Sequence, residues 1–184
     1  MIGFARDGDR LVAELEEVEV ALVSSLVGQV VELLGGVHER DQSEDPFAAW
    51  AGEFDGGVTL DEGDPVIARL FPDAYPDDAP ASAELKHYTR DALRRGRVAD
   101  GALVIADLEA TDGGAAPLVV PADHVEAWIK TINAVRLSLA VRLGIETDAD
   151  HRQLERLSPR DPRYQVVAIY DWLAVVMESL LDAL

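Results

Sequence analysis

The stretch ADHVEAWIKTINAVRLSLAVRL, residues 122–143, decides the fold class of this chain. Its apolar side chains recur every three or four residues, which is the spacing that one face of an α-helix requires. The predicted core face of this helix consists of Val125, Trp128, Ile129, Ile132, Leu139 and Leu143. A continuous apolar face of this length needs other elements to cover it, so the sequence predicts a helix that packs within a domain core.

Helical spacing extends over segments on both sides of this stretch. Residues 16–34 repeat apolar side chains at the same period, with acids in the first turn and Gly35-Gly36 as a stop signal. Towards the C-terminus, a short helix is predicted after Thr147 and a long one over residues 162–184. The last helix has a predicted core face of Val167, Tyr170, Ala174, Met177 and Leu181.

Two aspartates followed by proline predict helix starts between these segments. Asp64-Pro65 and Asp78-Ala-Pro80 each place a capping carboxylate before a proline that fits the first turn of a helix. The first of these helices is expected to be short. The second is expected to continue helical to Glu109, with a bend near Gly96 or Gly101.

Extended structure is predicted at two places. Residues 4–15 predict a hairpin around Asp7-Gly8-Asp9, because a glycine between short polar residues supplies the positive φ that a hairpin turn needs. Residues 116–121 form an apolar run that ends in proline, which favours a connector or an edge strand. Residues 38–64 are polar and rich in glycine, and they predict a loop with one short helical turn.

A length of 184 residues fits one domain of ordinary size. The elements together predict a mainly α protein, a single-domain helical bundle of about five to seven helices with a short N-terminal β-hairpin. In this interpretation one domain spans residues 1–184, with the hairpin in residues 1–15 and the helical part in residues 16–184.

Composition narrows the classes of function. The formal net charge is -19 and lies mostly in the first 80 residues; such a field repels phosphates, so direct nucleic-acid binding is disfavoured. The chain has no cysteine, which excludes disulfides and thiolate chemistry. The sequence shows neither a secretory signal pattern nor the roughly 20 uninterrupted apolar residues of a membrane span. We therefore expect a cytoplasmic protein without a membrane partner.

Signals for a metal, cofactor or catalytic site are weak. Glu84 and His87 have the E-x-x-H spacing of di-iron bundles, but those bundles need two such motifs and one is present. Asp148 and His151 lie within one turn, yet acids after Thr147 are also what a helix N-terminus attracts, and capping is the favoured interpretation. No Walker, Rossmann or nucleophile-elbow pattern occurs. We expect no metal, no cofactor and no catalytic residue.

A more informative feature is a row of four cations, Lys86, Arg90, Arg94 and Arg97, which we call the basic strip. Offsets of four, four and three place these residues on one face of a helix. The favoured interpretation is a solvated face or one docked on the acidic first 80 residues. The functional alternative is a surface that binds an acidic protein partner.

Polar residues also interrupt the predicted apolar faces. Asn133 and Arg136 fall on the face of the helix after Pro121, and Asp171 falls on the face of the last helix. A buried arginine without a partner costs several kcal/mol, so we predict a buried polar pair between Arg136 and Asp171, more often structural than functional.

The last helix carries a second apolar stripe, formed by Ile169, Trp172 and Val176. Two stripes are more than one packing surface absorbs easily. The favoured interpretation is a central helix covered on both sides, and the alternative is a homodimer interface.

Three segments are more specific than the helical pattern: Arg69-Leu-Phe-Pro-Asp-Ala-Tyr-Pro-Asp-Asp78, Trp128-Ile-Lys-Thr-Ile-Asn-Ala-Val-Arg-Leu137 continuing to Ile145, and Tyr170-Asp-Trp-Leu173 with Glu178-Ser-Leu180. Together they resemble an actinobacterial family of oxidative-stress transcriptional regulators, the AosR family, formerly a domain of unknown function. The resemblance covers nearly the whole chain. Its motif residues are Phe71, Pro72, Asp73, Tyr75, Asp77, Asn133, Arg136, Tyr170, Asp171 and Trp172.

The resemblance implies a non-enzymatic helical regulator that acts through protein–protein contacts, for example with the transcription machinery. Redox-sensing members of the family use a pair of N-terminal cysteines, which this chain lacks. The regulatory role therefore carries over better than the sensing mechanism does. The alternative is an uncharacterised enzyme or metal-binding protein with a pocket near Tyr75, Asp77, Asn133 and Arg136.

Overall fold

A computed structural model describes residues 2–35, 63–75 and 77–184. Six helices and three strands follow one another along this part of the chain, which confirms the mainly α fold class. The elements are β1 (Ile2–Asp7), β2 (Arg10–Glu14), α1 (Glu17–Leu33), α3 (Pro65–Leu70), α4 (Ala79–Glu109), β3 (Leu118–Val120), α5 (Val125–Leu143), α6 (Asp148–Leu154) and α7 (Arg163–Asp182). The loop predicted over residues 38–64 lies almost entirely outside the described residues.

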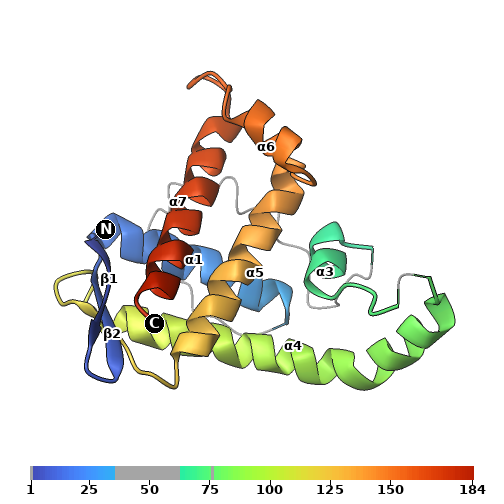
Figure 1. The fold of residues 1–184 in the computed structure, drawn as a ribbon, viewed down its shortest axis with the longest axis horizontal. Helices are drawn as coiled ribbons and strands as arrows, with labels where there is room; N and C mark the ends of the chain where they lie inside the picture. The colour runs from blue at the N-terminus through green and yellow to red at the C-terminus, as the bar shows by residue number, and fades with distance from the viewer. Residues whose placement is uncertain (1, 36–62, 76) are drawn as a thin grey trace.

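Helix α5 is the element around which the others pack (Figure 1). It contacts α1, α3, α4 and α7. Trp128 and Ile132 are 1% and 0% exposed, and Leu139 and Leu143 are also buried, as predicted. Val125 and Ile129 pack at the edge of the same core. Asn133 lies outside this face and is exposed, so the prediction that the core covers it was wrong.

Helix α4 crosses below α5 as one continuous, curved ribbon (Figure 1). Both glycines at which a bend was predicted lie inside it. At Gly101 an added Cβ would lie 2.5 Å from a methyl group of Val31, so the missing side chain allows α1 and α4 to approach closely. At Gly96 nothing lies within 4 Å of an added Cβ.

The three strands form one antiparallel sheet in the order β1-β2-β3. The predicted hairpin is confirmed, with Gly8 at a φ of 67° in its turn. β3 is an edge strand, which was one of the two predictions for its segment. Phe4 turns into the core, where its ring meets Trp128 edge-on at 6.1 Å.

Helix α7 packs against α5 and β1, but its buried face differs from the predicted one. Leu173 and Leu180, which neither predicted stripe included, are 0% exposed, whereas Leu181 is 49% exposed. Val176 of the second stripe is buried, and Ile169 and Trp172 pack against the core. The core face is thus a single face that lies between the two predicted stripes and draws on both.

Among the described residues, α7 is the helix whose length and composition would suffice to cross a membrane. Core helices share these properties, and α7 buries six apolar side chains. It also carries Asp171 and Glu178 in its interior turns.

Three helix starts have the predicted caps. The side chains of Asp64 and Asp78 accept hydrogen bonds from backbone N–H groups of α3 and α4. Thr147 and Asp150 form a reciprocal capping box at α6, which confirms the capping interpretation of the acids in this segment. The Thr147 hydroxyl and the Thr147 backbone N–H both donate hydrogen bonds to the Asp150 carboxylate and lower the pKa of that carboxyl. The hydroxyl has the larger effect.

Candidate functional site

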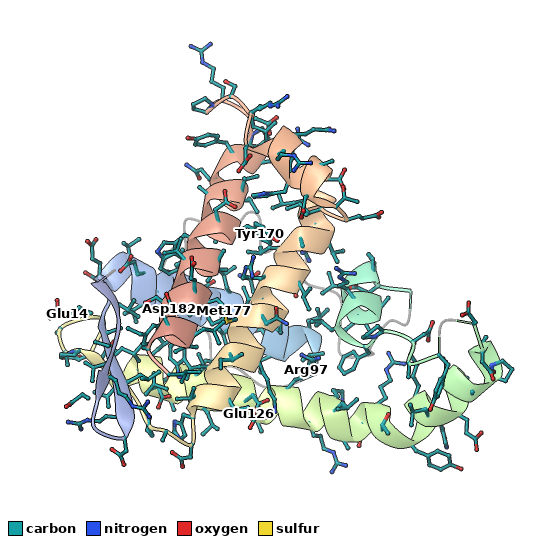
Figure 2. All side chains as sticks on the ribbon, viewed as in Figure 1. Glu14, Arg97, Glu126, Tyr170, Met177 and Asp182 are labelled. Atoms are coloured by element: carbon teal, nitrogen blue, oxygen red, sulfur yellow. The ribbon has the colours of Figure 1, made fainter. Side chains whose placement is uncertain are left out.

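The basic strip lies on the inner side of α4. Its residues continue the same helical face as the buried residues Gly101, Val104 and Leu108. Figure 2 shows Arg97 on the side of α4 from which the rest of the molecule rises. The strip is thus a docked face, which was one of the two structural interpretations that the sequence favoured.

Two of its arginines close the ends of other helices. Arg94 donates from Nη1 to the carbonyl oxygen of Leu34, the C-cap of α1, at 2.9 Å. Arg97 donates from Nη2 to the carbonyl oxygen of Leu70, the last residue of α3, at 3.1 Å. The last carbonyls of a helix lack intrahelical partners and carry partial negative charge, so a cation from a neighbouring helix stabilises both ends.

The other contacts of the strip also lie within the chain. The Arg97 guanidinium sits 5.4 Å from the ring centre of Phe71, and its burial lowers the pKa of Arg97, an effect opposed by Asp100. Lys86 forms an ion pair with Asp73 at 2.7 Å. Arg90 is half-buried. Binding of an acidic partner by this strip remains an untested prediction, but its cations already have intramolecular roles.

The predicted pair between Arg136 and Asp171 does not form, because each side chain has another neighbour. The Arg136 guanidinium lies 5.0 Å from the ring centre of Tyr170, and its Nε is buried without a hydrogen-bond partner. The Asp171 carboxylate lies 2.7 Å from Nε2 of His151 on α6. The arginine is therefore held by a cation–π contact, and the aspartate ties α7 to α6.

The His151 ring also lies 5.6 Å from that of Tyr170. Figure 2 shows Tyr170 between α7 and α5. Tyr170 thus gathers side chains from α5 and α6 around one ring. The sequence identified three of these four residues. It missed His151 as the partner, because His151 is the fourth residue of a separate short helix, where it favoured only a capping interpretation.

The alternative pocket near Tyr75, Asp77, Asn133 and Arg136 is not supported by the positions of these residues. Tyr75 is 51% exposed on the connection between α3 and α4, and Asp77 and Asn133 are exposed. None of the four lines the hollow between β1 and α7 or the smaller one between α1, α4 and α5. The larger hollow, about 620 Å³ and open to solvent, lies between β1 and the C-terminal half of α7.

The family-motif residues before α4 organise the connection between two helices. Phe71 is buried, Pro72 follows it on the surface, and Asp73 holds Lys86. The backbone N–H of Tyr75 donates to Oγ of Ser82, which in turn donates to the Tyr75 carbonyl oxygen. These contacts give the motif a structural role. Trp172 of the C-terminal motif is partly buried and packs against the core.

A third polar cluster was not foreseen. Asp107 of α4 accepts a hydrogen bond from Nε1 of buried Trp128 at 2.8 Å and lies 3.0 Å from Nδ1 of His124. In the part of the chain that the structure describes, no group of three or more histidines and acids is arranged to hold a metal ion. Glu84 and His87 are both exposed on α4.

The feature with the clearest functional potential is the outer side of α4, which the sequence reasoning overlooked. Seven exposed residues follow one another there at offsets of three and four, and none is charged. We call them the outer strip: Leu85, Tyr88, Ala92, Gly96, Ala99, Leu103 and Ala106. Tyr88 is 73% exposed, and Leu85 and Leu103 are 38% and 37% exposed. Figure 1 shows all the other helices on the opposite side of α4.

The outer strip was identifiable in the sequence by its spacing. It was missed because alanine and glycine dominate it, and because the basic strip on the opposite face gave a stronger signal. An exposed apolar strip along a whole helix is unusual for a surface that only meets water, and such patches mark interaction sites.

The chain matches proteins described as oxidative stress regulators. It is 31% identical over 188 residues to Oxidative stress regulator AosR of Mycobacterium tuberculosis and to that of Mycobacterium bovis, with 96% of this chain and 83% of each relative covered. A relative from Mycobacterium leprae is 32% identical over 193 residues. No solved structure matches the chain. These names support a regulatory role, and they describe regulators, not enzymes.

The family model of domain of unknown function DUF2017 matches residues 1–184. The motifs at Phe71–Asp78, on α5 and on α7 are therefore parts of one family fold that extends over the whole chain. On this match and on the identity to its mycobacterial relatives, the chain belongs to the DUF2017 family, which it shares with proteins named AosR.

Proposed function

We propose that this protein is a non-enzymatic cytoplasmic regulator that acts by binding another protein, with the transcription machinery as the class of partner. The observation that supports it best is the outer strip, an apolar surface along α4 that no described element covers. The regulator names of its relatives point the same way. The charge of -19 disfavours direct contact with DNA phosphates.

Control by cysteine oxidation is not part of this proposal, because the chain contains no cysteine. If the protein responds to oxidants, the response does not pass through a cysteine of this chain. Partner binding is therefore expected to persist when purified protein is treated with peroxide.

The proposal is tested by crosslinking the tagged protein in a mycobacterial host, with and without oxidant, and identifying the crosslinked proteins by mass spectrometry. We expect one specific protein partner at near-stoichiometric yield, and altered transcript levels when the protein is depleted. Recovery of no specific partner under either condition would count decisively against it. Tight, sequence-specific DNA binding by the isolated protein at moderate salt would instead establish a DNA-binding regulator.

A further inference from the structure

We propose that the outer strip binds a single α-helix of a partner protein, and that this helix carries Lys or Arg residues beside its apolar face. The inference rests on the proposed function, since it specifies the partner surface. The sequence analysis suggested a partner with an acidic surface, whereas the outer strip favours a partner with a basic one.

The shape of the strip specifies a helix as the occupant. From Leu85 to Ala106 it spans 22 residues, or about 32 Å along the helix axis. Its offsets of 3, 4, 4, 3, 4 and 3 follow the heptad pattern by which two helices pack along a common seam, except for one extra four-residue step at Gly96. The larger side chains stand towards the ends, whereas Ala92, Gly96 and Ala99 occupy the middle. Small residues there let a second helix approach closely along the strip.

The charged residues beside the outer strip indicate the charge of the partner helix. Four residues of α4 are both charged and exposed: Glu84, Asp91, Arg95 and Glu109. Three of them are acids, and the single arginine forms an ion pair with Asp91 at 3.2 Å. A helix with cations flanking its apolar face complements this border, as charged residues flank the seam of a coiled coil.

The inner face explains why the border is acidic. Lys86, Arg94 and Arg97 point towards Asp73 and the ends of α1 and α3, so most cations of α4 are used inside the molecule. Three of the five acids of α4, Glu84, Asp91 and Glu109, are exposed, whereas Asp100 and Asp107 lie towards the rest of the molecule. The same allocation argues against a second copy as the occupant, because two copies would bring acidic borders together in chains that each carry a charge of -19.

The test uses a designed amphipathic peptide of about three heptads, with leucine at the seam positions and lysine beside them, labelled for fluorescence anisotropy. A second peptide replaces every lysine with glutamate. The protein variant carries Leu85→Gln, Tyr88→Gln and Leu103→Gln, which removes apolar surface without changing charge. The matched control carries Val18→Gln and Leu181→Gln, at apolar residues that are 61% and 49% exposed on α1 and α7.

We expect the lysine peptide to bind the native protein and the control variant equally, and the outer-strip variant about tenfold more weakly or worse. The glutamate peptide should bind at least about tenfold more weakly than the lysine peptide. Circular dichroism of each variant checks that its fold is intact.

Four results would overturn the inference. Equal binding to native protein and outer-strip variant would show that the lysine peptide merely follows the net charge. Equal binding of both peptides would remove the basic partner. Self-association of the native protein that the outer-strip variant abolishes, without peptide binding, would make a second copy the occupant. If crosslinking captures a partner that the outer-strip variant retains, this inference fails while the proposed function stands.

Discussion

Asp107 joins the end of one helix to the start of another. Its carboxylate, 10% exposed, accepts from the indole N–H of Trp128 and meets the ring of His124, the N-cap of α5. Trp128 is 1% exposed, so without this acceptor its N–H would be buried with no hydrogen-bond partner. One carboxylate thereby fixes the orientation of the largest side chain in the core.

Asp107→Ala should therefore lower the free energy of unfolding by about 1–3 kcal/mol, measured by urea denaturation. Asp107→Asn keeps an oxygen that can accept from the indole and should lose clearly less. A silent alanine variant, or equal losses for both variants, would show that the hydrogen bond to Trp128 does not stabilise the core.

The cluster around Tyr170 makes a second prediction at the residue scale. Double-mutant cycles should give coupling energies of about 0.5–1 kcal/mol for Arg136 with Tyr170 and for His151 with Asp171, because each pair is in contact and partly exposed. Arg136 with Asp171 should couple by less than about 0.5 kcal/mol. A coupling energy between Arg136 and Asp171 that exceeds those of the other two pairs would show that the predicted ion pair forms after all.

Helix α4 uses its two faces differently. The inner face supplies cations to the C-terminal ends of α1 and α3 and ends in a buried apolar segment, whereas the outer face is apolar and no described element covers it. Because the helix has 31 residues, one element serves both purposes along its whole length.

The capping role of the arginines is testable with two neighbours on α4. Arg94→Met removes the donor to Leu34 at the end of α1 and should cost about 1 kcal/mol of unfolding free energy. Arg95→Met is the matched control, since Arg95 is exposed and, among the described residues, contacts Asp91 alone; it should cost less than about 0.5 kcal/mol. If thermal unfolding shows equal shifts for the two variants, the contact with α1 contributes nothing.

The two glycines of α4 should respond oppositely to the same change. Gly96→Ala meets nothing within 4 Å and should stabilise the protein by about 0.5–1 kcal/mol, because alanine loses less backbone freedom in a helix. Gly101→Ala places a methyl group against Val31 and should destabilise it by about 1–3 kcal/mol. Denaturation that shows a gain for both would mean that α1 and α4 lie further apart.

At the scale of the whole molecule, the net charge of -19 opposes folding, because folding brings like charges together. Salt screens this repulsion within about 10 Å at 0.1 M ionic strength. The melting temperature should therefore rise when sodium chloride is increased from about 10 mM to about 150 mM. A melting temperature that falls over this range would show that attractive ion pairs, such as Lys86 with Asp73, outweigh the overall repulsion.

The family assignment also belongs to this scale. The family model spans residues 1–184, so the sheet, the long helix α4 and the pair α5 and α7 belong to one family fold. The motif residues that carried the resemblance serve the architecture in this fold: Phe71 and Asp73 hold α4, and Tyr170 joins α5 to α7. The outer strip, on which the proposed protein-binding role depends, contains none of these motif residues. The motifs only help to hold α4, which carries the strip, in place.

The sequence by itself determined the elements and their ends. Helical spacing, the capping residues Asp64, Asp78 and Thr147, and the glycine of the N-terminal hairpin act over a few residues, so they are readable without a partner element. The fold class and the core face of α5 followed from the same local periodicity.

Only the tertiary structure decided how polar groups were paired and which face of each helix was left uncovered. Asp171 pairs with His151 instead of Arg136 because of the way α5, α6 and α7 cross in space. The cations of α4 point inward because of the way α4 packs against α1 and α3. Several side chains in a helical sequence are within reach of any given charge, and local spacing does not rank them. The outer strip also depends on the tertiary structure. An apolar row on a helix is a candidate binding surface only when no described element covers it.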